Sequence, residues 1–364
     1  MKLAIVSPLV SPIREPQRGG SQAFVSELAR GLVQRGHEVR LYAASGSAVR
    51  GVEVIDAGVD HRDLAATLYR PSGGSVARST VAERAFARVY KLVREGRYDV
   101  VHNHAFDAPA VDLASTLSAP VVHTIHLPPD TAVAGAIRQA LRRSPPPVVA
   151  CVSVSHANAW RRIVPVDAIL PPYIPTRQIH FSPAAGSGAV FAGRFSPEKG
   201  AADAIAIARI AGVEIDVFGE SYEPEYAREQ IDPRRAEPGV AVHPAVSQPA
   251  LWEAMARAAV VLCPARWEEP FGMVAAEAQA CGTPVVAFRR GALPDVIVDG
   301  TTGFLVQPDD HQAAAEAVRR VPALSRWACR EHAESHLDIE RSLDAHERLY
   351  ERVATSGVGA RIGA

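Results

Sequence analysis

The sequence contains little cysteine and little lysine, and it has no long hydrophobic run. Its four cysteines show neither paired metal-ligand spacing nor the density of a disulfide framework. Cys151, Cys263 and Cys281 lie in apolar stretches, where a buried thiol packs as a small hydrophobic group. No apolar run reaches the length of a membrane span, and the opening MKLAIVSPLV lacks the cationic segment and the cleavage site of a signal peptide. We therefore expect a cytoplasmic protein with no integral membrane segment.

The chain also lacks an excess of charge of either sign, because its formal net charge is −1. No global field therefore recruits nucleic acid or an anionic membrane, and an anion site has to be built from local cations. Only three cations are lysines (Lys2, Lys91 and Lys199), and nearly all the others are arginines. A lysine in a candidate site therefore indicates that a compact point charge is favoured there.

At 364 residues the chain is long enough for two domains, each with its own core. Residues 2–7 form a continuous apolar run, as in a buried parallel strand. After a loop rich in Pro, Arg and Gly, Ser21 is expected to cap a helix that stops at Gly36. The helix places four apolar residues on one face: Phe24, Leu28, Leu32 and Val33.

Three later segments, 99–104, 120–126 and 147–155, each predict a short buried strand that ends in polar residues. Open α/β sheets bind ligands beyond such carboxyl ends, which makes His104, His126 and Ser153 or Ser155 candidates for a site. His102 and His104 resemble a zinc pair, but we expect their side chains to face opposite sides of the strand. Further ligands are also missing nearby, so no metal site is predicted.

A Pro-rich stretch at 171–188 predicts an interdomain linker between an N-terminal domain at 1–170 and a second domain at 189–330. The second half again runs strand, polar loop, helix, strand, with further strands at 260–265, 284–288 and 304–308. The charged stretch at about 331–353 predicts a C-terminal helix. We expect two doubly wound, Rossmann-like α/β domains.

The loop GRFSPEKG at 193–200 carries two cations, Arg194 and Lys199, with Lys199 at the start of a helix. Helix starts expose unpaired N–H groups and favour phosphate. The alternative is an ordinary surface turn with solvated charges. The loop is not a Walker motif, and neither half carries G-x-G-x-x-G after its first strand, which disfavours an NAD site.

The segment ARWEEPFGMVAAEAQACGTPVVAF at 265–288 carries two glutamates eight positions apart, Glu269 and Glu277. With Pro270 starting a helix, this spacing spans roughly 12 Å, comparable to the separation of a sugar and a ribose across a diphosphate. Amides near Gly272 and Met273 would then face the phosphates. The alternative makes Glu269 a helix-terminus acid and Glu277 a solvated residue, although a lone carboxylate in an apolar helix needs a reason.

These motifs together resemble glycosyltransferase family 4, whose members are retaining enzymes of the GT-B class. The resemblance covers most of the chain and rests on GGSQAFVSELARGLVQRGHEV, HTIH, GRFSPEKG and EEPFGMVAAEAQACGTPVVA. It implies two Rossmann-like domains that face a central cleft, an N-terminal acceptor domain, a C-terminal donor domain, and residues 331–364 returning to the first domain. The linker PPYIPTRQIHF and the loop SPIREPQRGG depart from the family pattern, which leaves the acceptor open.

The resemblance also implies a role for each matching position. Arg194 and Lys199 correspond to the pair that neutralises the donor diphosphate, which Gly20 approaches from the N-terminal domain. Glu269 corresponds to the glutamate near the sugar and Glu277 to the one on the ribose. The remaining matches are His126, facing the transferred sugar, and the backbone of Phe271, Gly272 and Met273. Arg18 and His104 are weaker candidates for the acceptor side.

We therefore expect a hexosyltransferase that uses a nucleoside-diphosphate sugar and no cofactor or metal, since no Asp-x-Asp motif occurs. UDP is favoured over GDP as the carrier commoner in the family, and the acceptor is a small molecule, a glycan or a lipid-linked hydroxyl. The alternatives are an epimerase, a phosphorylase, or a catalytically silent sugar-nucleotide-binding protein. Residues 80–95 form an amphipathic basic helix, for which core packing is favoured over peripheral membrane contact.

Overall fold

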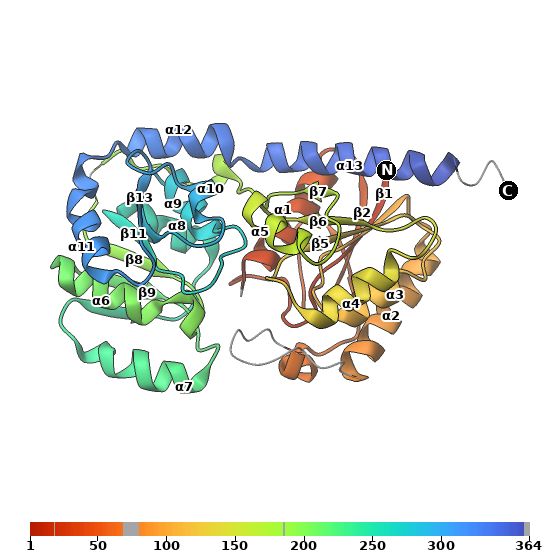
Figure 1. Ribbon diagram of the computed structural model, residues 1–364, viewed down its shortest axis with the longest axis horizontal. Helices are drawn as coiled ribbons and strands as arrows, with labels where there is room; N and C mark the ends of the chain where they lie inside the picture. Colours follow the sequence, from red (N-terminus) through yellow and green to blue (C-terminus); the bar gives the residue numbers. More distant parts are fainter. Residues whose placement is uncertain (18, 68–79, 185, 360–364) are drawn as a thin grey trace. The chain divides into compact units, whose positions relative to one another are not determined.

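The computed structural model describes residues 1–17, 19–67, 80–184 and 186–359 and divides into two compact units (Figure 1). Unit 1 comprises Met1–Arg14, Gly20–Pro172 and Glu340–Ala364. Unit 2 comprises Glu15–Gly19 and Tyr173–Ile339. Apart from the short segment Glu15–Gly19, the chain leaves unit 1 after Pro172 and returns to it at Glu340 for the last helix.

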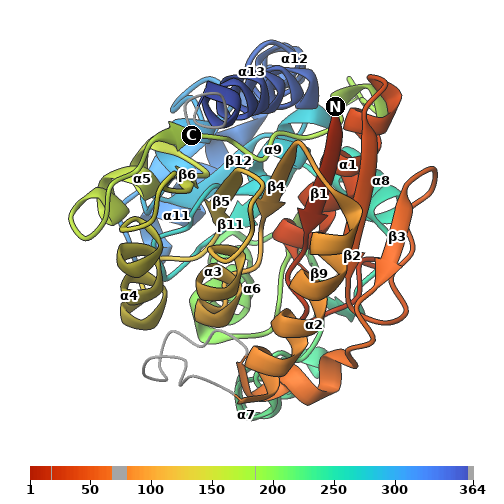
Figure 2. The ribbon, with the colours of Figure 1, turned by 90° about the vertical axis from the view of Figure 1, so that its right-hand side faces the viewer.

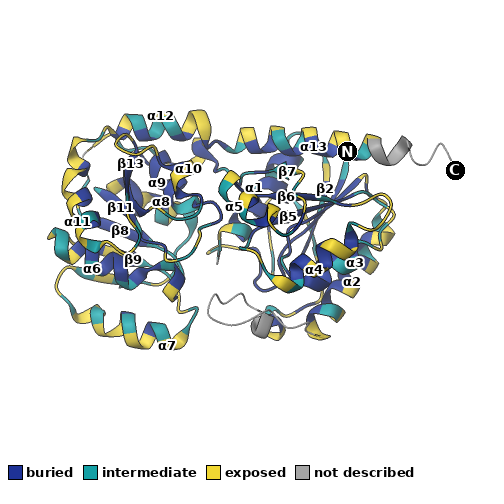
Figure 3. Cartoon of the chain, viewed as in Figure 1, coloured by how far each residue is buried: buried dark blue, intermediate teal, exposed yellow. Residues whose placement is uncertain are grey.

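Unit 1 contains a seven-stranded parallel sheet in the order β3-β2-β1-β4-β5-β6-β7. Its first strand lies in the middle, so the strand order reverses between β1 and β4. The strands are short, and the central ones are buried and rich in valine, which suits a sheet covered on both faces (Figure 3). They are β1 (Lys2–Val6), β2 (Glu38–Ala43), β3 (Glu53–Asp56), β4 (Val100–Asn103), β5 (Val121–Ile125), β6 (Val148–Cys151) and β7 (Ala168–Ile169).

The helices of unit 1 cover both faces of this sheet. Figure 2 shows α2, α3 and α4 side by side in front of the strands, and the contacts between neighbouring helices agree. The other face carries α13, whose Tyr350 hydroxyl lies 2.6 Å from His102 Nδ1 on β4. The helices are α1 (Gly20–Gln34), the 3-10 segment η1 (His61–Thr67), α2 (Thr80–Gly96), α3 (Ala108–Ala114), α4 (Thr131–Ala140), α5 (Val154–Arg161) and α13 (Ile339–Gly359).

The helix α2 is amphipathic and packs its apolar face into the core of unit 1. Its buried residues are Ala82, Ala85, Phe86, Val89, Tyr90 and Val93, and they join the hydrophobic cluster beneath the sheet. Its basic residues are exposed: Arg84, Arg88, Lys91 and Arg94. Core packing with a solvated basic face is therefore confirmed for this segment.

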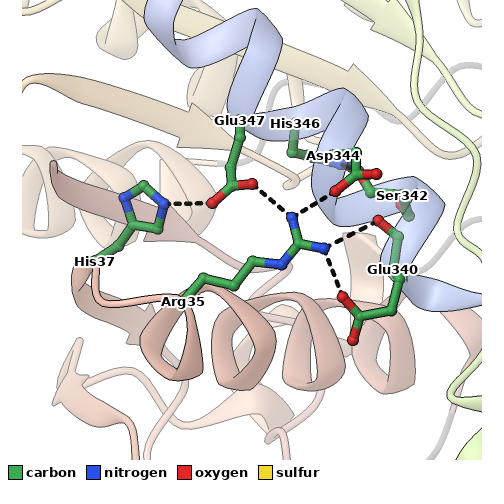
Figure 4. Close-up of polar contacts among 7 residues, drawn as sticks. All are labelled: Arg35, His37, Glu340, Ser342, Asp344, His346 and Glu347. Carbon is green, nitrogen blue, oxygen red and sulfur yellow. Dashed lines mark hydrogen bonds and ion pairs between the residues drawn. The ribbon is translucent and has the colours of Figure 1, made fainter.

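The last helix, α13, packs against α1 within unit 1 through apolar contacts and ion pairs. A Cβ atom on Gly31 would lie only 2.6 Å from Leu343 Cδ1, so a glycine on α1 lets the two helices approach closely. Arg35, one residue after α1, donates to Glu340 at 2.5 Å, to Asp344 at 2.7 Å and to Glu347 at 2.5 Å (Figure 4). The helix thus forms part of unit 1 although it comes last in the sequence.

Unit 2 contains a six-stranded parallel sheet in the order β10-β9-β8-β11-β12-β13, again with its first strand in the middle. Its strands are β8 (Ala189–Ala192), β9 (Ile215–Phe218), β10 (Val240–His243), β11 (Val260–Cys263), β12 (Val285–Phe288) and β13 (Gly303–Val306). Its helical segments are η2 (Thr176–Gln178), η3 (Pro197–Lys199), α6 (Ala201–Ala211), α7 (Pro224–Tyr226), η4 (Ala227–Ile231), η5 (Asp232–Ala236), α8 (Gln248–Arg257), α9 (Met273–Ala280), α10 (Leu293–Val296), α11 (His311–Arg320), η6 (Val321–Ala323) and α12 (Arg326–His336). The predicted pair of doubly wound α/β units is confirmed.

Several predicted element boundaries were wrong. The strand predicted at 147–155 ends at Cys151, because Ser153 caps α5 by accepting a hydrogen bond from His156 N at 3.0 Å. The helix α1 begins at Gly20, so Ser21 lies inside its first turn instead of capping it. The predicted helix at about 331–353 is two helices, interrupted at Leu337 and Asp338, where Asp338 pairs with Ile174.

Candidate active site

The loop that follows β8 in unit 2 carries Arg194 and Lys199. It turns through η3 and reaches α6 by way of Gly200, whose φ of 74° is left-handed. A Cβ atom at Gly200 would lie 2.2 Å from the carbonyl oxygen of Pro264, so only glycine allows this backbone approach. Since Pro264 directly follows β11, the glycine brings Lys199 against the loop after the neighbouring strand.

Lys199 and Glu269 form an ion pair across these two loops. Lys199 Nζ lies 2.8 Å from Glu269 Oε2 and 3.1 Å from Oε1. The same ammonium lies 4.6 Å from the ring centroid of Trp267, whose Nε1 donates to Glu269 Oε2 at 2.7 Å. The Lys199 side chain is 23% exposed and that of Glu269 is 15% exposed, so both can be reached from solvent.

The backbone around Glu269 is held by the loop that follows β12. Gly291 has a left-handed φ of 56°, and a Cβ atom there would lie 2.3 Å from Glu269 N. Ala292 N donates to Glu269 O at 2.8 Å. Glu269 is therefore fixed by tertiary contacts instead of by a helix, because α9 begins only at Met273.

The helix α9 begins later than the spacing of Glu269 and Glu277 had predicted. Gly272 occupies the N-cap position with a φ of 101°, so Glu269 and Pro270 precede the helix. The two glutamates are thus not separated by eight helical residues, and the estimated span does not follow from helix geometry. Phe271 is buried, with its ring 5.8 Å from that of Tyr173, which leaves the backbone of this segment as its polar part.

Arg194 is supported in a similar manner to Lys199. Its guanidinium carbon lies 4.1 Å from the ring centroid of Tyr222, and its Nη2 donates to Glu198 Oε1 at 3.1 Å. The side chain of Glu198 is only 3% exposed. The structure thus shows each loop cation over an aromatic ring and beside a carboxylate.

Glu277 is buried in α9 with 5% of its surface exposed, so the alternative of a solvated residue is wrong. Gln248 Nε2 donates to Glu277 Oε1 at 3.2 Å. Burial raises the pKa of this carboxyl to about 7, although the hydrogen bond from Gln248 acts in the opposite direction. Burying an ionised carboxylate without hydrogen-bond donors is unfavourable, so a ligand whose hydroxyl groups donate to Glu277 would stabilise the ionised form.

In unit 2 these groups come from the carboxyl ends of β8 and β11, which are paired strands at the reversal of strand order. That is the place where doubly wound sheets bind ligands. Two cations and the start of α9 favour an anion, and two carboxylates favour hydroxyl groups. The combination suits a ligand with phosphate at its centre and hydroxyl-bearing rings beside it.

In unit 1, His104 and His126 follow the neighbouring strands β4 and β5. His104 Nδ1 lies 2.9 Å from His126 Nε2, and His126 is 9% exposed. Burial, together with nearby His156 and His346, lowers the pKa of His126 to about 3. His126 is therefore neutral near pH 7 and can share a hydrogen bond without carrying charge.

The expectation that His102 and His104 face opposite sides was wrong. Their ring centroids are 4.0 Å apart, because residues two positions apart along an extended chain share one side. The intervening Asn103 points the other way, toward His123 at 3.1 Å. His102 bonds to Thr124 and Tyr350, which gives this ring a structural role.

Gly20, the third N-terminal candidate, is the first residue of α1, a helix of fifteen residues whose first-turn amides lack intrahelical acceptors. Arg18 lies outside the described residues.

Over the described ranges, no group of three or more His, Cys, Asp or Glu side chains is placed to hold a metal ion.

The four cysteines are all free thiols; Cys151, Cys281 and Cys329 are buried, and Cys263 is partly buried. Within the part of the chain that is described, no helix combines the length and apolarity that a membrane crossing requires.

Sequence reasoning did not identify Trp267, Tyr222 and Glu198 as parts of this arrangement. Trp267 and Glu198 lie inside the two motifs, but their contacts depend on how separate loops meet. Tyr222 lies in the loop after β9, where no motif marks it.

Comparison with known proteins covers nearly the whole chain. Residues 18–176 match the family model described as Glycosyltransferase Family 4, and residues 176–334 match the one described as Glycosyl transferases group 1. A D-inositol 3-phosphate glycosyltransferase of Arthrobacter sp. is 30% identical, covering 86% of this chain and 84% of the relative. A phosphatidyl-myo-inositol mannosyltransferase of Mycolicibacterium smegmatis is 28% identical, covering 97% and 95%.

Solved structures with the same fold are more distant in sequence. Sucrose-phosphate synthase from Thermosynechococcus elongatus has a TM-score of 0.78 and 19% identity, covering 98% of this chain and 99% of that one. Anabaena HepE in complex with UDP and glucose has a TM-score of 0.75 and 19% identity, covering 96% and 99%. These similarities establish the fold as that of the GT-B glycosyltransferases.

Proposed function

Because the chain belongs to glycosyltransferase family 4, we propose that it is a retaining, metal-independent hexosyltransferase acting on a nucleoside-diphosphate sugar and a hydroxyl acceptor. The observation that carries this proposal is the contact between Lys199 and Glu269 at the strand-order reversal of unit 2. In this contact an ammonium group suited to binding phosphate lies beside a carboxylate suited to accepting hydrogen bonds from sugar hydroxyls. The proposal assigns the donor to unit 2 and the acceptor to unit 1.

The donor site is proposed to bind each part of the nucleotide sugar with a separate group. Arg194, Lys199 and the amides at the start of α9 contact the diphosphate. Glu277 accepts hydrogen bonds from the ribose, and Glu269 accepts them from the sugar. UDP is proposed as the carrier, supported by the UDP and UDP-glucose complexes of the similarly folded HepE.

Breaking the anomeric C–O bond leaves negative charge on the departing diphosphate and gives the sugar oxocarbenium character. Fixed cations aimed at that charge supply the largest stabilisation in many enzymes. Arg194 and Lys199 supply two positive charges at the leaving group, which supports transfer without a metal ion. Retention follows when the acceptor hydroxyl attacks from the leaving-group side and gives its proton to the departing phosphate.

In unit 1, His126 is proposed as a neutral hydrogen-bonding group for a sugar hydroxyl, as its low pKa requires. His104 fixes the orientation of His126 through their shared hydrogen bond. The two relatives described above are named for inositol-bearing acceptors. Inositol 3-phosphate and phosphatidylinositol are therefore the first acceptors to test, beside glycans.

The test begins with thermal-shift screening against UDP, GDP and their hexose derivatives. The donor that stabilises the protein is then incubated with each acceptor, and the product's anomeric configuration is determined by NMR. Transfer with retention in the presence of EDTA is the expected result. Epimerised donor or phosphorolysis would show a different reaction, and a bound donor that is never hydrolysed or transferred would show a binding protein.

Replacing the loop cations tests the site assignment. Lys199→Ala and Arg194→Ala should each lower turnover on the order of a hundredfold, because each removes one charge that stabilises the leaving group. Lys91→Ala, an exposed lysine of α2, is the matched control and should leave turnover unchanged. Near-normal turnover of the double variant would show that the site lies elsewhere.

A further inference from the structure

Trp267 contacts both members of the ion pair at the centre of the proposed donor site. Its indole Nε1 donates its single hydrogen to Glu269 Oε2 at 2.7 Å, and its ring lies 4.6 Å from Lys199 Nζ. One side chain thus holds the carboxylate by its polar edge and the ammonium by its π face. A tryptophan can offer both, because its indole combines an N–H donor with a large electron-rich ring.

The packing around Trp267 distinguishes it from a residue that fills the core. It is partly exposed, whereas Trp252 in the same unit is 5% exposed. Its contacts to Lys199 and Glu269 are therefore not a by-product of core packing.

We expect donor binding to change the partner of Lys199 but not that of Trp267. Without a diphosphate, Lys199 Nζ is shared between the two oxygens of Glu269. A diphosphate carries more negative charge than one carboxylate and attracts the ammonium, which removes two of the hydrogen bonds that orient Glu269. The indole N–H then remains on Oε2 and leaves Oε1 free for a sugar hydroxyl.

Arg194 provides an independent instance of the same arrangement. Its guanidinium lies over Tyr222 and bonds to the buried Glu198, so each loop cation has both a ring and a carboxylate. A ring attracts a cation without competing for the hydrogen-bond geometry that phosphate requires. Each ring can therefore keep its cation in place while the cation exchanges carboxylate for phosphate.

We propose, on the basis of the proposed function, that Trp267 is a positioning residue of the donor site. Its N–H orients Glu269 toward the sugar once Lys199 has turned to the diphosphate, and its ring face supports Lys199 in both states. Trp267 touches neither the transferred atom nor the leaving group and acts through these two side chains.

The two contacts can be separated by substitution. Trp267→Phe removes the N–H but keeps a ring face for Lys199, whereas Trp267→Leu removes both. Trp327→Phe is the matched control, because Trp327 is 63% exposed on α12 and packs on Phe181. Calorimetry with UDP and GDP measures the affinity of the diphosphate, and steady-state kinetics with the corresponding hexose donor measures kcat and KM.

Trp267→Phe should bind the nucleoside diphosphate within about twofold of the parent protein and lose about tenfold in kcat, as loss of a hydrogen bond to a charged group predicts. Trp267→Leu should in addition weaken diphosphate binding about threefold or more, because the cation–π contact is lost. Trp327→Phe should match the parent protein in both measurements.

A double-mutant cycle with Glu269→Gln keeps the test decisive if Trp267→Phe also lowers stability. If Trp267 acts through Glu269, Trp267→Phe costs much less kcat in the Glu269→Gln protein than in the parent protein. Equal losses in the two backgrounds, or an unchanged kcat for Trp267→Phe, would overturn the inference. A parent protein that binds no nucleoside diphosphate and transfers no sugar would instead overturn the proposed function itself.

Discussion

Replacing Glu277 by glutamine should change how the stability of the protein depends on pH. The carboxyl is buried in α9, and burial raises its pKa from 4.5 to about 7 in the folded protein. The folded state therefore holds the proton more tightly than the unfolded state does. Glutamine keeps the shape and a hydrogen-bond acceptor for Gln248 but carries no charge at any pH.

The magnitude follows from the difference between the folded and unfolded pKa values. A rise from 4.5 to about 7 corresponds to about 3 kcal/mol of unfavourable free energy for the ionised form. Below pH 4.5 both states are protonated and this cost is absent. As pH rises from 4.5 through 7, the unfolded state ionises first, and the parent protein loses about 3 kcal/mol that Glu277→Gln does not lose.

Denaturant unfolding of both proteins at intervals from pH 5 to pH 8 measures this difference directly. The free energy of unfolding of Glu277→Gln relative to the parent protein should increase with pH across that range. Glu253→Gln is the matched control on α8, because it makes the same substitution at a side chain that is 52% exposed instead of buried. A relative stability of Glu277→Gln that stays constant between pH 5 and pH 8 would refute the argument that burial penalises this charge.

Three further predictions concern the pH dependence of UDP binding, the roles of the two glutamates, and the ion pairs of Arg35. UDP should bind about tenfold more weakly at pH 6 than at pH 8, because the ribose hydroxyls donate to the ionised form of Glu277. Calorimetry at both pH values with the parent protein and with Glu277→Gln tests this. The same dependence of UDP affinity on pH in the two proteins would contradict it. Glu277→Ala should chiefly weaken nucleotide affinity, whereas Glu269→Ala should chiefly lower turnover, so the reverse pattern would exchange their roles. Arg35→Ala should lower the free energy of unfolding by about 1 kcal/mol, because its three ion pairs to α13 are partly solvated (Figure 4). Thermal unfolding measures that loss, with Arg257→Ala as an exposed control, and equal melting temperatures for the two would contradict it.

Much of the fold was predictable because parallel strands buried on both faces appear in sequence as continuous apolar runs. The segments around Val100, Val121 and Val285 were located in this way. Helix starts were less accurate, because capping depends on backbone angles that residue types only favour. Gly272, with a φ of 101°, moved the start of α9 three residues beyond Pro270.

The candidate site was predictable where the chemistry lies in one motif and not where loops meet. Arg194 and Lys199 share one loop, so their charge could be recognised from sequence. Trp267 acquires its contacts only because Gly200 lets the loop after β8 approach the loop after β11. No periodicity in the sequence records that approach, since it depends on which strands are neighbours in the sheet.

The return of α13 to unit 1 has a consequence for the order in which the protein folds as the ribosome makes it. Unit 2 is complete once Ile339 has emerged, but unit 1 still lacks its last helix. Until then Gly31 lacks the Leu343 side chain that packs against it, and His102 lacks the Tyr350 hydroxyl as a hydrogen-bonding partner. The half that is synthesised first is therefore the half that matures last, and its exposed apolar surface needs protection throughout the translation of the other half.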